Sequence, residues 1–196
     1  MWVPYILAAA LFSRTASPSA PSVALRPLGA IDEHVVEGLA RNLSCLFGLN
    51  VAVLPGEPLP KSAYYAPRNR YRAADLVEFL DRTTAWEIPH VLGVTTRDIS
   101  ARKGENEDWG ILGIARLGGR PAVVSTHRLR SGGASKAMVS TRLERVAAHE
   151  LGHTLGLKHC DEPLCLMNDA EGSIRTIDVS TGLCARCRRV IEERAR

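Results

Sequence analysis

The feature that most constrains this chain is a run of three histidines, His149-x3-His153-x5-His159, with Glu150 directly after the first. Helical residues four apart lie about 40° apart around the axis, so the imidazoles of His149 and His153 can meet one ion. Gly156 can adopt the left-handed conformation that ends a helix, after which the chain can turn back and bring in His159. Three neutral imidazoles would leave a tetrahedral zinc ion one open position for water or substrate.

Chance is a poor explanation of this motif. The short pattern His-Glu-x-x-His is common in inert helices, but adding Gly156 and His159 makes a random match roughly a thousandfold rarer. Glu150 lies about 60° from His153 around the helix, near enough to reach a metal-bound water without binding the metal. The pattern therefore predicts a metal site at the histidines, with Glu150 as the general base.

Four of the five cysteines form two pairs near the C-terminus, Cys160-x4-Cys165 and Cys184-x2-Cys187. A CxxC pair can place both sulfurs on one zinc ion, and the second pair completes a tetrahedron with no open position, which predicts a structural zinc site. The alternative is two disulfides in an exported protein. The odd count and the clustering favour a metal site in a reducing compartment, with Cys45 as a buried thiol.

The charge pattern argues against nucleic acid as a partner. The formal net charge is +4, spread over the whole chain. Arg186, Arg188 and Arg189 are basic, but Glu192 and Glu193 follow them and no aromatic residue is interleaved. This is typical of a solvated helix face, so we expect no nucleic-acid binding. Hydrophobic residues make up 45% and charged residues 23%, as in ordinary globular proteins.

The N-terminus carries an apolar run over residues 2–12 that is too short to span a bilayer. No Lys or Arg precedes the run, and Arg14 follows it, which is atypical of a secretory signal. We therefore expect residues 1–22 to be an N-terminal extension or leader of a cytoplasmic protein without stable membrane association. The alternative is export, if residues 1–22 act as a signal peptide.

Hydrophobic periodicity predicts strands and helices that alternate along most of the chain. Helices are expected over 31–47, 70–83 and 136–155, with a short basic helix near Leu183. Strands are expected over 23–28, 50–54, 91–95, 111–117 and 122–129, and loops over 55–67 and 98–108. Pro27 argues for an edge position or an early end of the first strand. This order predicts an α/β chain, a mixed sheet with helices packed on it.

The motifs together resemble the archaemetzincins, a branch of the metzincin metalloproteases. That family's pattern is the extended histidine motif followed by Cys, four residues, Cys-x-Met, a spacer and CxxC. Here the Cys-x-Met element ends at Met167, and the spacer over 168–183 is sixteen residues, one shorter than in the family pattern. The resemblance covers residues 149–187 and, less specifically, the strand-helix-strand pattern from Val23. Residues 1–22 have no counterpart in it.

The resemblance implies a zincin-like fold: a twisted mixed sheet, an active-site helix and a small four-cysteine zinc-bound region below the cleft. It implies an intracellular peptidase with two zinc ions, Glu150 as the base and Met167 as the Met-turn residue. The implied ligands are His149, His153 and His159 for the catalytic zinc, and Cys160, Cys165, Cys184 and Cys187 for the structural zinc. We accordingly expect a zincin-like subdomain over 23–156, a C-terminal subdomain over 157–196, and a monomer.

Two functions compete. The first is zinc-dependent hydrolysis of peptide or protein substrates by a zinc-bound water with Glu150 as general base, the endopeptidase or aminopeptidase mode being unresolved. The alternative is a non-catalytic zinc-stabilised interaction protein that uses the four-cysteine module and the basic C-terminal helix. Glu150 favours the enzyme, because an inert site needs no carboxylate beside its ligands. For the enzyme, the strand over 122–129 is expected at the cleft rim, where an extended peptide could pair with it.

Overall fold

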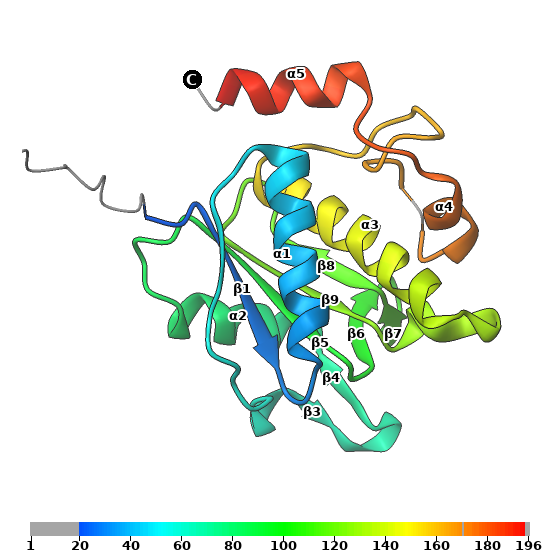
Figure 1. The fold of residues 1–196 in the computed structure, drawn as a ribbon. Coiled ribbons are helices and arrows are strands. Elements are labelled where there is room, and N and C mark those ends of the chain that lie inside the picture. The colour runs from blue at the N-terminus through cyan, green and yellow to red at the C-terminus, as the bar shows by residue number, and fades with distance from the viewer. Residues whose placement is uncertain (1–19, 170, 195–196) are drawn as a thin grey trace, which may run out of the picture.

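The computed structural model describes residues 20–169 and 171–194, so the predicted leader lies almost entirely outside the described residues (Figure 1). A five-stranded sheet forms the centre, in the order β2-β1-β5-β9-β8. All neighbours in this sheet are parallel except β8, which is antiparallel to β9. Its strands are β1 (Val23–Leu28), β2 (Val51–Val53), β5 (His90–Thr95), β8 (Gly113–Ala115) and β9 (Pro121–Ser125). The predicted mixed sheet is confirmed.

A smaller sheet has the order β3-β4-β6-β7 and was not predicted; β3 lies in the loop expected over 55–67, and β4 in the first residues of the helix expected over 70–83. Its strands are β3 (Tyr64–Tyr65), β4 (Arg70–Arg72), β6 (Ile99–Lys103) and β7 (Asn106–Ile111). β6 and β7 form a hairpin where a loop was predicted over 98–108, and that prediction is wrong. The hairpin is charged and mostly exposed, so it lacks the hydrophobic alternation that would have predicted strands. Cross-strand pairs, such as Ala101 with Trp109, stabilise it instead.

Helices cover both faces of the large sheet (Figure 1). α1 (Glu33–Phe47) and α3 (Lys136–Thr154) pack on one face, and α2 (Ala73–Thr83) packs on the other. Alternate strand residues serve the two faces, as Val23 and Leu25 do for the first and Ala24 for the second. Short 3-10 helices complete this part of the chain at η1 (Lys61–Ala63), η2 (Ala66–Arg68) and η3 (Arg128–Gly133).

The C-terminal region contains two helices, α4 (Ile174–Val179) and α5 (Ala185–Arg194). α5 was predicted, whereas α4 falls in a stretch expected to be irregular. Arg142, which is buried in α3, fixes α4 by donating to both carboxylate oxygens of Asp178 at 2.7 Å. The same guanidinium donates to the Leu129 carbonyl at 2.8 Å. Tertiary contacts of this kind override the weak helical pattern of so short a segment.

The first strand is not at an edge, so the inference from Pro27 is wrong. β1 lies between β2 and β5, and every residue of β1 is buried. β2 ends at Val53, and beyond it the Glu57 amide donates to the Pro27 carbonyl at 2.9 Å. The missing N–H of Pro27 therefore breaks no regular ladder bond.

Cys45 is exposed, which corrects the expectation of a buried thiol. The buried residues of α1 follow helical spacing at Val36, Leu39, Leu43 and Phe47. Cys45 is two positions from both Leu43 and Phe47, which places it on the far side of the helix.

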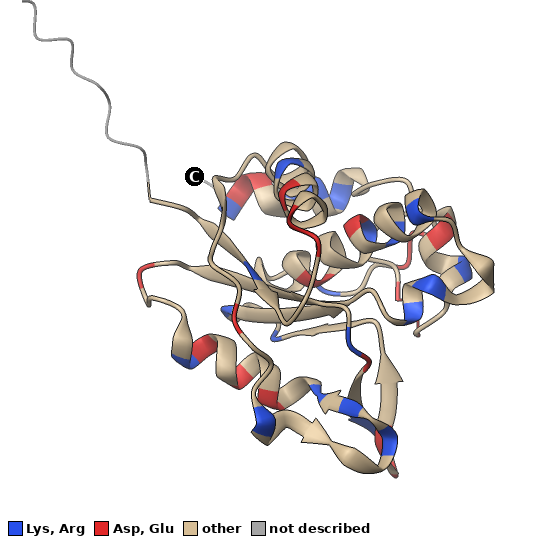
Figure 2. Ribbon diagram, turned by 60° about the horizontal axis from the view of Figure 1, so that its bottom comes forward, with Lys and Arg blue, Asp and Glu red and all other residues tan. Residues whose placement is uncertain are grey.

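Acidic and basic residues are interspersed on the helices and the hairpin rather than gathered on one face (Figure 2). Over the part of the chain that the structure describes, no helix is long and apolar enough to cross a membrane.

Candidate metal centres

The structure brings together the three histidines that the sequence singled out. His149 and His153 lie on the last turns of α3, and His159 returns from the loop after it. The Nε2 atoms of His149 and His153 are 3.0 Å apart, and one nitrogen from each of the three rings lies within 4.8 Å of the others. A tetrahedral zinc with bonds of about 2.1 Å would hold two nitrogens about 3.4 Å apart, so the His149 and His153 nitrogens fit such an ion after a small outward shift.

The second nitrogen of each imidazole is already engaged. His149 Nδ1 donates to the Leu166 carbonyl at 2.7 Å, and His153 Nδ1 donates to the Leu157 carbonyl at 2.8 Å. His159 Nδ1 lies 3.2 Å from a carboxylate oxygen of Asp169. Such partners fix each ring and leave Nε2 for a metal.

Burial keeps the first two imidazoles neutral. It lowers the pKa of His149 to about 4, outweighing the hydrogen bond to the Leu166 carbonyl, which raises it. Burial also lowers the pKa of His153, again against a hydrogen bond, here to Leu157. Neutral imidazoles offer the lone pair that a metal ion requires.

Glu150 is 8% exposed and faces the edge strand of the large sheet. Gly113 of β8 makes room for it, since a Cβ there would come within 2.7 Å of Glu150 Cγ. Glu150 forms no hydrogen bond or ion pair with any residue that the structure describes, and burial raises its pKa to about 8. A cation bound nearby would favour the ionised form and lower this pKa.

The turn after α3 has the form that the sequence predicted. Gly156 has φ +88°, a conformation that residues with a side chain rarely adopt. The turn leads the chain back toward His159 and then Cys160. Met167 is fully buried below the helix. Its sulfur packs against Gly152, and a Cβ at that glycine would come within 2.6 Å of the sulfur.

A cavity of about 360 Å³ opens beside the histidines. One wall is β8, the other is α3, and the outer parts come from the β6–β7 hairpin and the segment after Met167. β8 is the edge strand here, whereas β9 is paired on both sides. The strand at the rim is therefore β8, which overturns the expectation for 122–129.

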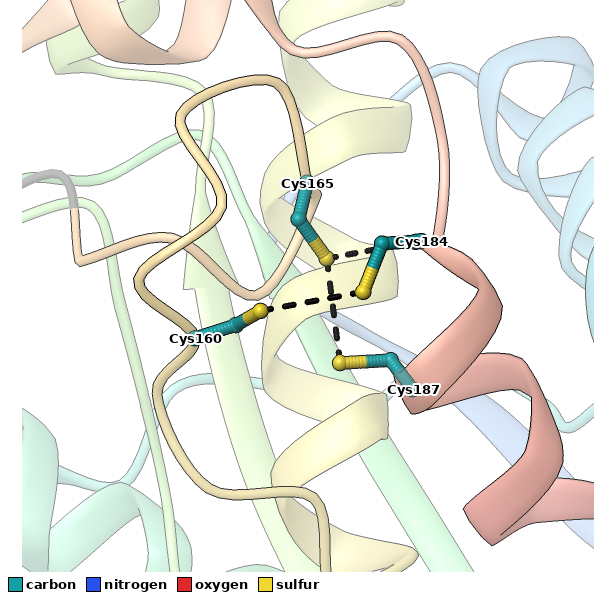
Figure 3. Close-up of side chains that lie close together, drawn as sticks. All are labelled: Cys160, Cys165, Cys184 and Cys187. Atoms are coloured by element: carbon teal, nitrogen blue, oxygen red, sulfur yellow. Dashed lines mark hydrogen bonds between the residues drawn. The ribbon is translucent and has the colours of Figure 1, made fainter.

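The four paired cysteines converge from two segments, the loop that holds Cys160 and Cys165 and the start of α5 (Figure 3). All are free thiols. The sulfurs of Cys160 and Cys184 are 3.7 Å apart, and those of Cys165 and Cys187 are 3.8 Å apart. A tetrahedral zinc with Zn–S bonds of about 2.3 Å sets its sulfurs about 3.8 Å apart, so the cluster already has the required size.

Positive charge and backbone donors surround these sulfurs. Arg186 Nη2 donates to Cys160 Sγ at 3.1 Å, and the Cys184 amide donates to Cys165 Sγ at 3.4 Å. A backbone hydrogen bond from Cys187 is the main cause that lowers the pKa of Cys184 to about 7. Thiolates are the form that binds zinc.

The two clusters share a short stretch of chain. His159 and Cys160 are adjacent, and the Cys160 amide donates to the Met167 carbonyl at 2.8 Å. Leu166, next to Met167, accepts the hydrogen bond from His149. A disturbance of the cysteines would therefore reach two of the three histidines.

Sequence reasoning missed several parts of the histidine site. Asp169, ten residues after His159, pairs with its imidazole. The sequence offered one clue to this pair, since Asp169 is a carboxylate that follows Met167 by two residues. Arg145 lines the cavity and donates to the Ile177 and Asp178 carbonyls at 3.0 and 2.8 Å. Its position one helical turn before His149 could have placed it on the same face.

The sequence of this chain is similar to those of known peptidases. The family model described as peptidase family M54 matches residues 60–193. The archaemetzincin of Halobacterium salinarum is 32% identical over 173 residues, covering 84% of this chain and 96% of the relative. The archaemetzincin of Archaeoglobus fulgidus is 35% identical over 164 residues, covering 83% and 94%.

Solved structures agree in fold. The crystal structure of the archaemetzincin from Methanopyrus kandleri aligns with a TM-score of 0.77 at 30% identity, over 92% of this chain and 98% of that one. The archaemetzincin from Archaeoglobus fulgidus, solved in complex with malonate, aligns with a TM-score of 0.72 at 34% identity, over 86% and 98%.

Proposed function

The chain belongs to peptidase family M54, the archaemetzincins, and is a zinc metallopeptidase; from this premise we propose that it cleaves peptide bonds at the three-histidine site with Glu150 as general base. The observation that carries the proposal is the convergence of His149, His153 and His159 beside a buried carboxylate that is not one of the grouped ligand atoms. Membership of a peptidase family also disfavours the alternative of a non-catalytic interaction protein.

The proposed ligands of the catalytic zinc are the Nε2 atoms of the three histidines. Their Nδ1 atoms are held by Leu166, Leu157 and Asp169, which supports this choice of ligand atom. A zinc ion held there would supply a Lewis acid toward the scissile carbonyl and its attacking water.

Glu150 handles the proton. Its carboxylate accepts a proton from the water that attacks the scissile carbonyl and returns it to the departing amine. Its place between α3 and β8 keeps it within the cavity and away from bulk solvent, so no other described side chain competes for its oxygens.

β8 orients the substrate. Gly113, Ile114 and Ala115 line the cavity, and β8 pairs with β9 on one edge and with no described strand on the other. An extended peptide can add to the free edge by main-chain hydrogen bonds, which would lay the scissile bond across the cavity beside Glu150.

A second zinc belongs to the four cysteines in this proposal, bringing the count to two per chain. The sulfur spacing and the absence of disulfides support it. With four thiolates the ion has no open position, so its role is to hold residues 157–194 together as a C-terminal subdomain. Four reduced cysteines suit a reducing compartment such as the cytoplasm. We propose a monomer.

The test is cleavage of a peptide library by zinc-loaded wild type and Glu150→Ala. We expect a loss of about 10²–10⁴-fold in turnover, since that is the usual contribution of a general base. Zinc content and the melting curve should stay unchanged, because Glu150 is not a ligand. Glu144→Ala, also on α3 but outside the cavity, is the matched control and should stay active. Persistence of full activity in Glu150→Ala would remove Glu150 from this role.

A further inference from the structure

A second cavity, of about 380 Å³, lies toward the opposite end of α3 from the histidines. The parallel strands β1, β5 and β9 are neighbours, so their carboxyl ends meet at one edge of the sheet. Ile31, Thr96 and Thr126 follow these strands and line the cavity. In open α/β sheets, this edge is where ligands bind.

One part of the wall of this cavity is apolar. Val35 of α1, Val139 and Leu143 of α3, and Ile31 contribute to it. Such walls fit a hydrocarbon body rather than a bare inorganic ion, and the volume lies in the usual range for small-molecule sites.

The mouth is positively charged. Arg130 and Lys136 line it, and neither side chain forms an ion pair or a hydrogen bond with any residue in the described ranges. Asp32 is the only acidic residue among the described residues that line the cavity, and its carboxylate accepts the α1-capping hydrogen bond from the His34 amide at 2.9 Å. The start of α3 at Lys136 adds partial positive charge.

The floor holds a hydroxyl without a partner. Thr126 is 4% exposed, and its Oγ1 is buried with no hydrogen-bond partner in the described structure. The other hydroxyls that line the cavity already donate, Thr96 to the Ala30 carbonyl at 3.0 Å and Ser140 to Glu144 at 3.4 Å. A buried hydroxyl without a partner costs free energy in the fold, and this one lies under the surface of the cavity.

We propose that this cavity is a binding site for a small organic anion, distinct from the peptidase centre. Arg130 and Lys136 would pair with a single carboxylate or phosphate head group. The apolar body would lie against Val35, Val139 and Leu143. The site needs no metal, and it stands or falls independently of the proposed catalytic mechanism.

The experiment is a titration of zinc-loaded, ¹⁵N-labelled protein, followed by amide chemical shifts, with hexanoate and hexyl phosphate as probes. Hexan-1-ol and inorganic phosphate are matched probes that lack the charge or the apolar body. We expect saturable shifts at the amides of Thr96, Thr126 and Val139 with one or both of the amphiphilic anions, and binding about tenfold weaker with the matched probes. Which anion binds more tightly identifies the head group.

Two variants make the test specific. In Arg130→Ala/Lys136→Ala, affinity should fall about tenfold, since two charged contacts are lost. The control Arg41→Ala/Lys61→Ala removes two exposed cations elsewhere and should bind as wild type does. All four side chains are exposed, and a melting curve verifies folding.

Three outcomes would overturn the proposal. One is no shift at the cavity amides at tens of millimolar hexanoate and hexyl phosphate. The second is equal binding by wild type and Arg130→Ala/Lys136→Ala. The third is shifts confined to the turns of α3 around His149 and His153, which would show that the anion binds at the histidine centre instead.

Discussion

The two candidate metal centres lie on either side of the peptide bond between His159 and Cys160, yet they differ in openness. The histidine centre lines a cavity, and the His159 side chain is 50% exposed. The cysteine centre is enclosed, with three of its four residues buried and its sulfurs at the spacing that zinc requires. An open site admits substrate but also chelators, whereas a closed site becomes part of the folded structure.

The comparison predicts that the cysteine centre supports the histidine centre and not the reverse. Met167 and Leu166 transmit that support, because the Met167 carbonyl accepts from the Cys160 amide and the Leu166 carbonyl accepts from His149. Removing a cysteine should damage both centres, whereas emptying the histidine centre should leave the cysteine centre intact.

Cys184→Ser should have the largest effect. Loss of the enclosed zinc should reduce the free energy of unfolding by about 5 kcal/mol and Tm by about 10–20 °C. Catalytic zinc should also be lost, because His159 would no longer be positioned. Zinc per chain and melting curves measure both effects. Cys45→Ser changes an exposed thiol and should leave both unchanged. Normal catalytic zinc affinity in Cys184→Ser would show that the centres are not mechanically linked.

Brief chelation should separate the centres. The histidine zinc has an open position that a chelator can enter, so it should leave first, reducing zinc from about two ions per chain to one. Activity should disappear while the fold persists, and added zinc should restore activity. Metal content and circular dichroism before and after treatment are the measurements. Unfolding that coincides with loss of activity would contradict the comparison.

The sequence predicted the parts of these centres that follow short-range rules. α3 begins at Lys136 as expected and ends within one residue of the prediction. Helical spacing within it fixes the positions of His149 and His153 relative to each other. Gly156 marked the turn because few residues other than glycine adopt its φ. The grouping of the four cysteines followed from their spacing in the sequence.

The parts that it did not predict depend on long-range pairing. The edge position of β8 depends on the order of strands in the sheet, which no local pattern encodes. The β6–β7 hairpin is charged along much of its length, so the local sequence does not predict strands there. Its pairing, for example of Ala101 with Trp109, depends on the folded structure. α4 depends on the ion pair between Arg142 and Asp178, thirty-six residues apart.

Glu150 gives a pH-dependent test of the open centre in the zinc-free protein. Its pKa is raised by burial to about 8 in the folded chain, against 4.5 as the ordinary value. Between these values the unfolded chain loses the proton while the folded chain keeps it, so wild-type stability falls as pH rises from about 4.5 to 8. Glu150→Gln removes this penalty and should be more stable than wild type by about 4 kcal/mol at pH 8, with little difference at pH 4. Urea unfolding of both zinc-free proteins at the two pH values tests this, and an equal difference at both would refute it.

The smallest expected effect concerns the charge around the closed centre. A zinc ion with four thiolates carries a net charge of −2, and the Arg186 guanidinium donates to one of those sulfurs at 3.1 Å. Arg186→Ala should therefore leave zinc content and fold unchanged but make the Cys160 sulfur more nucleophilic, because the donor that reduces its electron density is gone. Release of zinc to a coloured chelator during thiol alkylation should become a few-fold faster. Arg189→Ala is the matched control, since Arg189 is exposed on the same helix and its side chain makes no hydrogen bond or ion pair with the described residues. Equal release rates for the two variants would mean that the enclosure of the sulfurs by α5 and the loop, rather than the arginine, protects this centre.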